Sequence, residues 1–140
     1  MTNVLFVCTG NTCRSPMAEA LLKAKKIEGI VVRSAGIFAS NGQDASKYAK
    51  EVLNDHHIVH NHQSKQLTLD DVQWATHILT MTESHASIIQ DYYPEFKSKV
   101  STLKGFVNRK GVNPDVLDPF GGNKEDYQRT FGELKELIEL

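Results

Sequence analysis

Short apolar runs alternate with helical patterns along the whole chain. The first run covers residues 3–7, and similar runs rich in β-branched residues follow at 30–32, 77–81 and 100–103. Segments with helical spacing or capping residues separate and follow these runs, at 16–27, 45–53, 68–71, 83–92 and after Asn123. Strands that alternate with helices predict a parallel sheet with helices on both faces. We therefore expect an α/β fold, a doubly wound parallel sheet of four strands.

Capping residues set the expected helix boundaries. Ser15 stands directly before Pro16, which predicts Ser15 as the N-cap and Pro16 as the first helical residue. Gly29 predicts the end of this helix. A capping-box pattern at 68–71 opens a short helix. Residues 110–122 carry glycine and proline, which predicts a loop before the final helix.

Length, charge and cysteine content limit the classes of function. The 140 residues suit one domain over 1–140, and a net charge of −1 gives no basic surface for nucleic acid or an anionic membrane. No apolar run approaches the roughly 18 residues of a membrane span, and residues 4–7 are too short for a signal peptide. The chain has two cysteines, Cys8 and Cys13, which cannot form a disulfide framework. We expect a cytoplasmic monomer.

The segment from Cys8 to Ser15 has the composition of a phosphate-binding loop. It joins the first predicted strand to the first predicted helix, at an edge of the sheet where ligands bind. Backbone N–H groups of such a loop converge on phosphate oxygens, and the planar fork of Arg14 can bind two of them at once. The residues expected to surround the phosphate between Cys8 and Arg14 are Thr9, Gly10, Asn11, Thr12 and Cys13.

Cys8 is the candidate nucleophile of this loop. The positive end of the helix dipole and the Arg14 charge favour its thiolate form, and the Ser15 hydroxyl can donate a hydrogen bond to the sulfur. Gly10 and Asn11 suit a tightly curved backbone. The alternative, that Cys8 is a small buried apolar residue and Arg14 a surface charge, leaves the rest of the loop unexplained.

A phosphatase also needs an acid to protonate the leaving group. Asp118 is our candidate, because Pro119 fixes its backbone and glycines follow in the same loop. Asp115 and Asp126 compete for this role on local grounds.

Three segments resemble landmarks of the low-molecular-weight protein tyrosine phosphatase family: residues 4–19, Ser34–Gly36 and Asp118–Pro119. The resemblance covers nearly the whole chain. It implies a flavodoxin-like fold, phosphorylated proteins as substrates, a phosphocysteine at Cys8 and Asp118 as acid and then base. It implies no metal and no cofactor.

Two positions depart from the tyrosine-specific pattern of that family. Thr12 stands where an apolar residue is common, and Phe120-Gly121 stands in place of paired tyrosines. Thr12, with Phe38 and Phe120 as pocket walls, resembles the bacterial protein-arginine phosphatase branch. We therefore predict phosphoarginine as the substrate, since phenyl faces accept a flat guanidinium. Phosphotyrosine stays open as the alternative, because its ring would stack there too.

Two further classes of protein share such a loop. An arsenate reductase passes oxidation along additional cysteines, and this chain has none after Cys13. A non-catalytic phosphate-binding module would need the loop without the acid, and Asp118 argues against it.

Two smaller features carry hypotheses of their own. Cys13 is a possible redox partner of Cys8 through a reversible disulfide, although it could instead pack behind the loop. His56, His57, His60 and His62 crowd together, but their spacing matches no standard zinc pattern, so we interpret them as a polar loop.

Overall fold

The computed structural model describes residues 2–58, 60–107, 115–116 and 118–138, and its centre is a four-stranded parallel sheet. The strand order is β2-β1-β3-β4, so β1 pairs with both β2 and β3. The strands are β1 (Thr2–Cys8), β2 (Ile30–Gly36), β3 (His77–Thr80) and β4 (Val100–Thr102). The predicted doubly wound α/β fold is confirmed.

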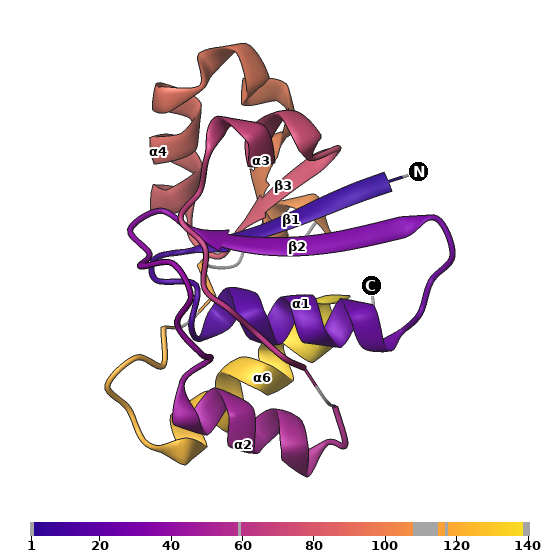
Figure 1. The fold of residues 1–140 in the computed structure, drawn as a ribbon, viewed down its shortest axis with the longest axis vertical. Coiled ribbons are helices and arrows are strands. Elements are labelled where there is room, and N and C mark those ends of the chain that lie inside the picture. Colours follow the sequence, from indigo (N-terminus) through magenta and orange to yellow (C-terminus); the bar gives the residue numbers. More distant parts are fainter. Residues whose placement is uncertain (1, 59, 108–114, 117, 139–140) are drawn as a thin grey trace.

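Helices cover both faces of this sheet. In Figure 1, α1, α2 and α6 lie below the sheet, and α3 and α4 lie above it. The helical elements are α1 (Arg14–Ala24), α2 (Lys47–Asp55), α3 (Leu69–Trp74), α4 (Glu83–Tyr92), the 3-10 helix η1 (Pro94–Lys99), α5 (Leu103–Phe106) and α6 (Lys124–Ile138). Within the described part of the chain, no helix is both long and apolar enough to cross a membrane.

The central strand β1 builds a core on each side. Val4 and Phe6 point into the cluster formed with α1, α2 and α6, whereas Leu5 and Val7 pack against residues of α3 and α4. Side chains alternate between the faces of a strand, so a strand buried on both faces is apolar throughout. This explains why residues 4–7 form a continuous apolar run. The side of α6 that faces this core buries four apolar or aromatic side chains: Tyr127, Phe131, Leu134 and Leu137.

The first helix differs from its prediction at both ends. It begins at Arg14 with Cys13 as the N-cap, so the prediction that Ser15 caps it is wrong. Pro16 is tolerated at the third helical position because the first four N–H groups of a helix lack an internal partner. The helix ends at Ala24 rather than at Gly29, since Lys26 already has a left-handed backbone with a φ of 49°.

Other helix starts agree with their sequence signals. Asp71 accepts from the backbone N–H of Thr68 at 3.1 Å, which confirms the capping box of α3. Asn123 accepts from the backbone N–H of Asp126 at 3.0 Å at the start of α6. The short helix α5 was not predicted, because four residues are too few for a periodic pattern. The predicted loop at 110–122 lies partly outside the described residues.

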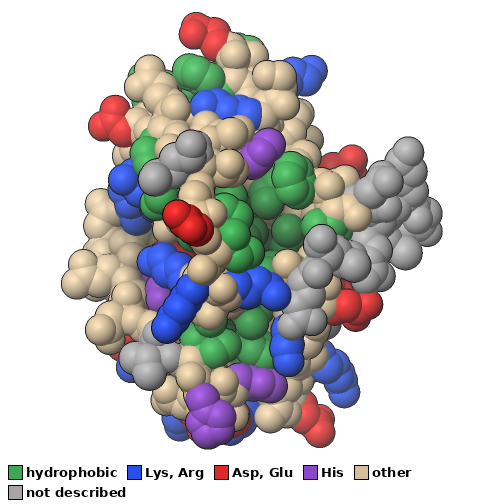
Figure 2. All heavy atoms as spheres, turned by 90° about the vertical axis from the view of Figure 1, so that its right-hand side faces the viewer, with side chains coloured by type: hydrophobic (Ala, Val, Ile, Leu, Met, Phe, Trp, Pro, Cys, Tyr) green, Lys and Arg blue, Asp and Glu red, His purple; other side chains and the backbone are tan. Residues whose placement is uncertain are grey.

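The face at which β1 and β2 begin is distinct from the edge that holds the phosphate loop. Figure 2 shows apolar side chains gathered in the middle of this face, with lysine and arginine side chains among them. A depression on the segment between α1 and β2 is lined by residues that include Ile27, Ile30 and Val31. The phosphate loop follows Cys8, so the candidate site lies at the opposite, carboxyl end of the strands.

Candidate active site

The loop between β1 and α1 forms one wall of a pocket at the carboxyl edge of the sheet. Its tightest point is Asn11, which is fully buried and has a φ of 56°. The end of β2 packs closely against the loop, since a Cβ on Gly36 would lie 2.6 Å from the backbone oxygen of Thr9. Glycine at 36 therefore allows the close approach of the two backbones.

Asn11 connects the loop to the neighbouring strand. Its Nδ2 donates to Ser15 Oγ at 2.8 Å and to Ser34 Oγ at 2.9 Å, and its Oδ1 accepts from the backbone N–H of Lys65 at 2.9 Å. The sequence predicts Asn11 only as a residue that tolerates curvature. The structure adds that its side chain holds the loop to β2.

The Cys8 sulfur lies 2.9 Å from Ser15 Oγ, and Cys8 is 2% exposed. Because Ser15 Oγ accepts from Asn11, its own hydrogen remains available for the sulfur. The arrangement therefore suits a thiolate at Cys8. It also explains why Ser15 is no N-cap, since its hydroxyl is used within the loop.

Arg14 faces the same pocket from the first turn of α1. Its guanidinium is nearly buried, donates from Nη1 to the Val116 carbonyl at 3.1 Å, and has Nη2 3.5 Å from Asp118 Oδ2. The buried Nε has no partner among the residues that the structure describes. The Asp118 side chain is half exposed, at 52%, whereas the side chain of Arg14 is buried.

Most of the predicted site residues line one pocket of about 250 Å³. Phe120 is 77% exposed at its rim, whereas Phe38 lies elsewhere, in a neighbouring groove beside Gln66 and Tyr92. Of the two phenylalanines predicted as pocket walls, Phe120 lines this pocket and Phe38 does not. Its lining residues are Cys8, Thr9, Gly10, Thr12, Cys13, Arg14, Asp118 and Phe120.

The structure separates the three candidate acids. Asp115 Oδ1 accepts from the backbone N–H of Glu83 at the start of α4, at 2.7 Å. Asp126 Oδ2 accepts from the backbone N–H of Asn123 at 3.1 Å and belongs to the first turn of α6. Asp118 lines the pocket. Among the three, only Asp118 has its carboxylate beside the phosphate loop.

His85 belongs to this site and was not predicted. Its Nε2 lies 2.9 Å from Thr9 Oγ1, and its side chain is buried in α4. Burial, with the Arg14 charge in addition, lowers the pKa of His85 to about 4. His85 is therefore neutral at physiological pH and supports Thr9 without adding a charge beside the phosphate loop.

A neutral buried histidine makes stability depend on pH. Between about pH 6.5 and about pH 4 the unfolded chain binds a proton at His85 and the native chain does not, so stability falls as pH falls, by up to roughly 3 kcal/mol. Urea unfolding at about pH 7 and about pH 5 measures this loss of stability. We expect the free energy of unfolding to fall less between the two pH values in His85→Gln than in wild type, because the glutamine amide keeps the contact with Thr9 but does not titrate. An equal loss in both proteins would contradict this assignment.

Cys13 lies in the same pocket as Cys8, and both are free thiols. Its sulfur lies 3.3 Å from the Tyr127 hydroxyl and 3.6 Å from Ser46 Oγ. Burial and the contact with Cys13 raise the pKa of Tyr127 to about 12, so the phenol stays protonated. The Cys8–Cys13 disulfide stays a prediction.

The four histidines do not form one polar loop. His56 and His57 are exposed, as that interpretation requires. His60 and His62 instead have side chains 7% and 3% exposed, beside the carboxylate of Glu19 on α1. Burial lowers the pKa of His60. Their burial corrects the interpretation for these two residues.

Comparison with known proteins finds relatives over nearly the whole chain. The model of the family described as low molecular weight phosphotyrosine protein phosphatase matches residues 3–140. A protein-arginine phosphatase of Geobacillus stearothermophilus is 50% identical over 136 residues, which are 97% of this chain and 90% of that protein. A low molecular weight protein-tyrosine phosphatase, PtpB of Staphylococcus aureus, is 42% identical over 96% of this chain and 93% of its own.

Solved structures share the fold closely. An arginine phosphatase from Geobacillus stearothermophilus superposes with a TM-score of 0.95 at 49% identity, covering 99% of this chain and 89% of that one. A Cys-to-Ser mutant of an arginine phosphatase, with a phosphorylated active-site serine, superposes with a TM-score of 0.92 at 46% identity, covering 98% and 91%. The latter is a covalent phosphoenzyme on the same fold.

Proposed function

Because the chain belongs to the low molecular weight phosphotyrosine protein phosphatase family, we propose that it hydrolyses phosphoarginine in proteins through a phosphocysteine at Cys8. The observation that carries the proposal is the pocket that brings the Cys8 thiol, the Arg14 guanidinium and the Asp118 carboxylate together. The phosphorylated serine of the related mutant supports a nucleophile at this position of the fold.

The first step transfers the phosphoryl group to the enzyme. The Cys8 sulfur forms a bond to phosphorus as the bond from phosphorus to the arginine nitrogen breaks, and Asp118 gives its proton to that nitrogen. Arg14 and the loop N–H groups bind the phosphoryl oxygens, on which charge spreads in the transition state. Binding energy is thereby directed at the transition state.

The second step releases phosphate. Asp118, now a carboxylate, takes a proton from water as the water oxygen attacks phosphorus. The bond from sulfur to phosphorus breaks, and the Ser15 hydroxyl stabilises the thiolate that leaves. The cycle uses neither a metal nor a cofactor.

Two side chains support phosphoarginine as the preferred substrate. Thr12 presents a hydroxyl-bearing, β-branched side chain to the pocket, and Phe120 offers an exposed ring at its rim. A ring at the rim can stack on a guanidinium by a cation–π contact, and Asp118 can pair with the same group. Phosphotyrosine is the second candidate, because PtpB is a tyrosine phosphatase by name and a phenol ring would also stack on Phe120.

The test compares kcat/KM for matched phosphoarginine and phosphotyrosine peptides. We expect wild type to prefer phosphoarginine, and we expect Thr12→Ile to lower the ratio of the two values by at least about tenfold, or about 1.4 kcal/mol of barrier. A tenfold preference of wild type for phosphotyrosine would assign the second substrate. Phe38→Ala is the control, because Phe38 lies outside the pocket.

We also propose that the chain acts as a cytoplasmic monomer with one phosphatase domain over 1–140 and phosphorylated proteins as its partners. Free thiols at Cys8 and Cys13 suit a reducing compartment. Size-exclusion chromatography with light scattering tests the oligomeric state.

A further inference from the structure

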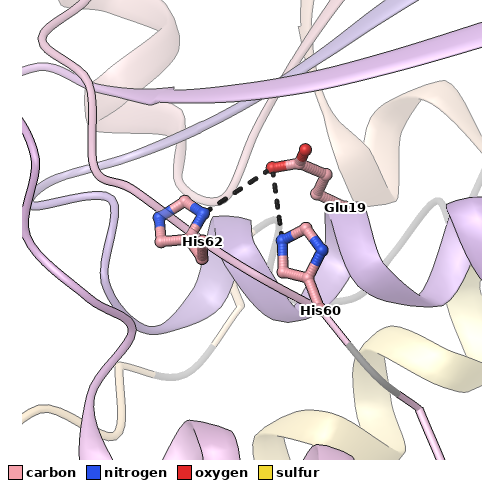
Figure 3. Close-up of side chains that lie close together, drawn as sticks. All are labelled: Glu19, His60 and His62. Atoms are coloured by element: carbon pink, nitrogen blue, oxygen red, sulfur yellow. Dashed lines mark ion pairs between the residues drawn. The ribbon is translucent and has the colours of Figure 1, made fainter.

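Three side chains from two parts of the chain meet beside Asn11 of the phosphate loop. Glu19 comes from α1, and His60 and His62 come from the segment between α2 and α3 (Figure 3). His60 Nε2 lies 3.8 Å and His62 Nδ1 lies 3.9 Å from Glu19 Oε1. One donor atom of each residue lies within 4.8 Å of the other two, and the three side chains are at most 10% exposed.

The hydrogen bonds leave two nitrogens available for a ligand. His62 Nε2 lies 2.6 Å from the Asn11 carbonyl oxygen, which can only accept, so Nε2 is the nitrogen that donates. Nδ1, on the side of Glu19, is then the nitrogen whose lone pair a neutral imidazole can offer to a metal. His60 Nε2 is buried and has no hydrogen-bond partner among the described residues. A buried nitrogen without a partner costs stability unless a ligand binds it.

We infer that Glu19, His60 and His62 bind a divalent transition metal ion, with Zn²⁺ as the best match. Two imidazole nitrogens and one carboxylate oxygen form a donor set that zinc uses with a fourth position open. Tetrahedral ligands about 2.0–2.1 Å from zinc lie about 3.3 Å from one another, so small side-chain rotations close the site. The bond from His62 Nε2 to a backbone carbonyl is the contact that a ligating histidine usually makes with its other nitrogen.

The surroundings allow an ion to reach this site. Glu19 Oε2 pairs with Lys23 Nζ at 2.6 Å, but the lysine side chain is 49% exposed and can turn into solvent. Glu19 Oε1 accepts from Ser34 Oγ at 2.5 Å, and a carboxylate oxygen has a second lone pair for a metal. A surface depression of about 440 Å³ is lined by both His60 and His62. The metal would be structural, since the proposed reaction does not use it.

The test titrates Zn²⁺ into the full chain and follows both calorimetric heat and thermal unfolding, with Co²⁺ as a spectroscopic probe. We expect one ion per chain, a higher unfolding temperature with Zn²⁺, and visible Co²⁺ absorption without an intense near-ultraviolet sulfur band. We expect His60→Gln and Glu19→Gln each to weaken binding by at least about tenfold. The control is His57→Asn, because His57 is exposed and asparagine tolerates its φ of 59°.

Two readouts, the calorimetric heat and the change in unfolding temperature on adding metal, keep the result interpretable if a variant is less stable. Each protein is compared with its own metal-free unfolding temperature, so that a lower starting value does not count as lost binding. The inference is overturned if wild type binds no Zn²⁺ at millimolar concentration, or if both glutamine variants bind as tightly as wild type. It is also overturned by an intense sulfur-to-cobalt band, which would place the ion on Cys8 or Cys13.

Discussion

The Cys8→Ser variant is expected to lose hydrolysis of phosphorylated substrates, with kcat lower by at least about a thousandfold. A serine hydroxyl is a far weaker nucleophile than a thiolate, and it is a worse leaving group when the intermediate breaks down. The loop should stay folded, because a serine at position 8 can still accept the Ser15 hydrogen bond. Phosphate binding should therefore persist while turnover disappears.

Intact mass spectrometry sharpens this prediction. Incubation of Cys8→Ser with substrate should add the mass of one phosphoryl group, as in the related mutant with a phosphorylated serine. Cys13→Ser is the matched control, since Cys13 lines the same pocket but is not the proposed nucleophile. Full activity of Cys8→Ser together with loss of activity in Cys13→Ser would contradict the assignment, because the nucleophile would then be Cys13.

The Asp118→Asn variant is expected to lower kcat by about a hundredfold to ten-thousandfold on phosphoarginine or phosphotyrosine, the range for loss of a general acid. Asparagine keeps the shape of the side chain but cannot give up a proton. The leaving group of an activated aryl phosphate needs little protonation. The rate of the first step, phosphoryl transfer to Cys8, should therefore fall much less with this substrate. The comparison uses kcat/KM on both kinds of substrate, because this ratio reports the steps up to phosphoryl transfer and leaves out the second step, in which Asp118 also acts.

Asp126→Asn is the control for this substitution, because its carboxylate is used at the start of α6. We expect it to leave kcat near that of wild type, with a small effect on stability. If Asp118→Asn were as active as Asp126→Asn on a phosphoarginine substrate, another group would have to supply the proton.

Local patterns predicted most of the fold. The apolar runs at 3–7 and 77–81 became central strands, because a strand buried on both faces needs an unbroken apolar sequence. The capping signals at Thr68 and Asn123 marked the starts of α3 and α6. The boundaries of α1 were less predictable, because the Ser15 hydroxyl has a stronger role inside the loop than at a helix cap.

The loop of the candidate site was predicted as one segment, but its supporting contacts were not. His85 lies 76 positions from Thr9, and His62 lies 51 positions from Asn11, so no local spacing links these pairs. Phe38 is predicted as a pocket wall through the resemblance to the protein-arginine phosphatase branch, and the structure places it in another groove. Such partners depend on how β2 and α4 pack around the loop.

The proposed phosphocysteine mechanism is tested most directly by identifying the atom that carries the phosphoryl group during turnover. Wild type is mixed rapidly with a protein phosphoarginine substrate, denatured within one turnover, and digested for mass spectrometry under conditions that preserve phosphocysteine. We predict the phosphoryl group on the Cys8 sulfur, formed and lost at rates no slower than kcat. A phosphoryl group on another residue, or turnover with no phosphoenzyme at all, would contradict the account.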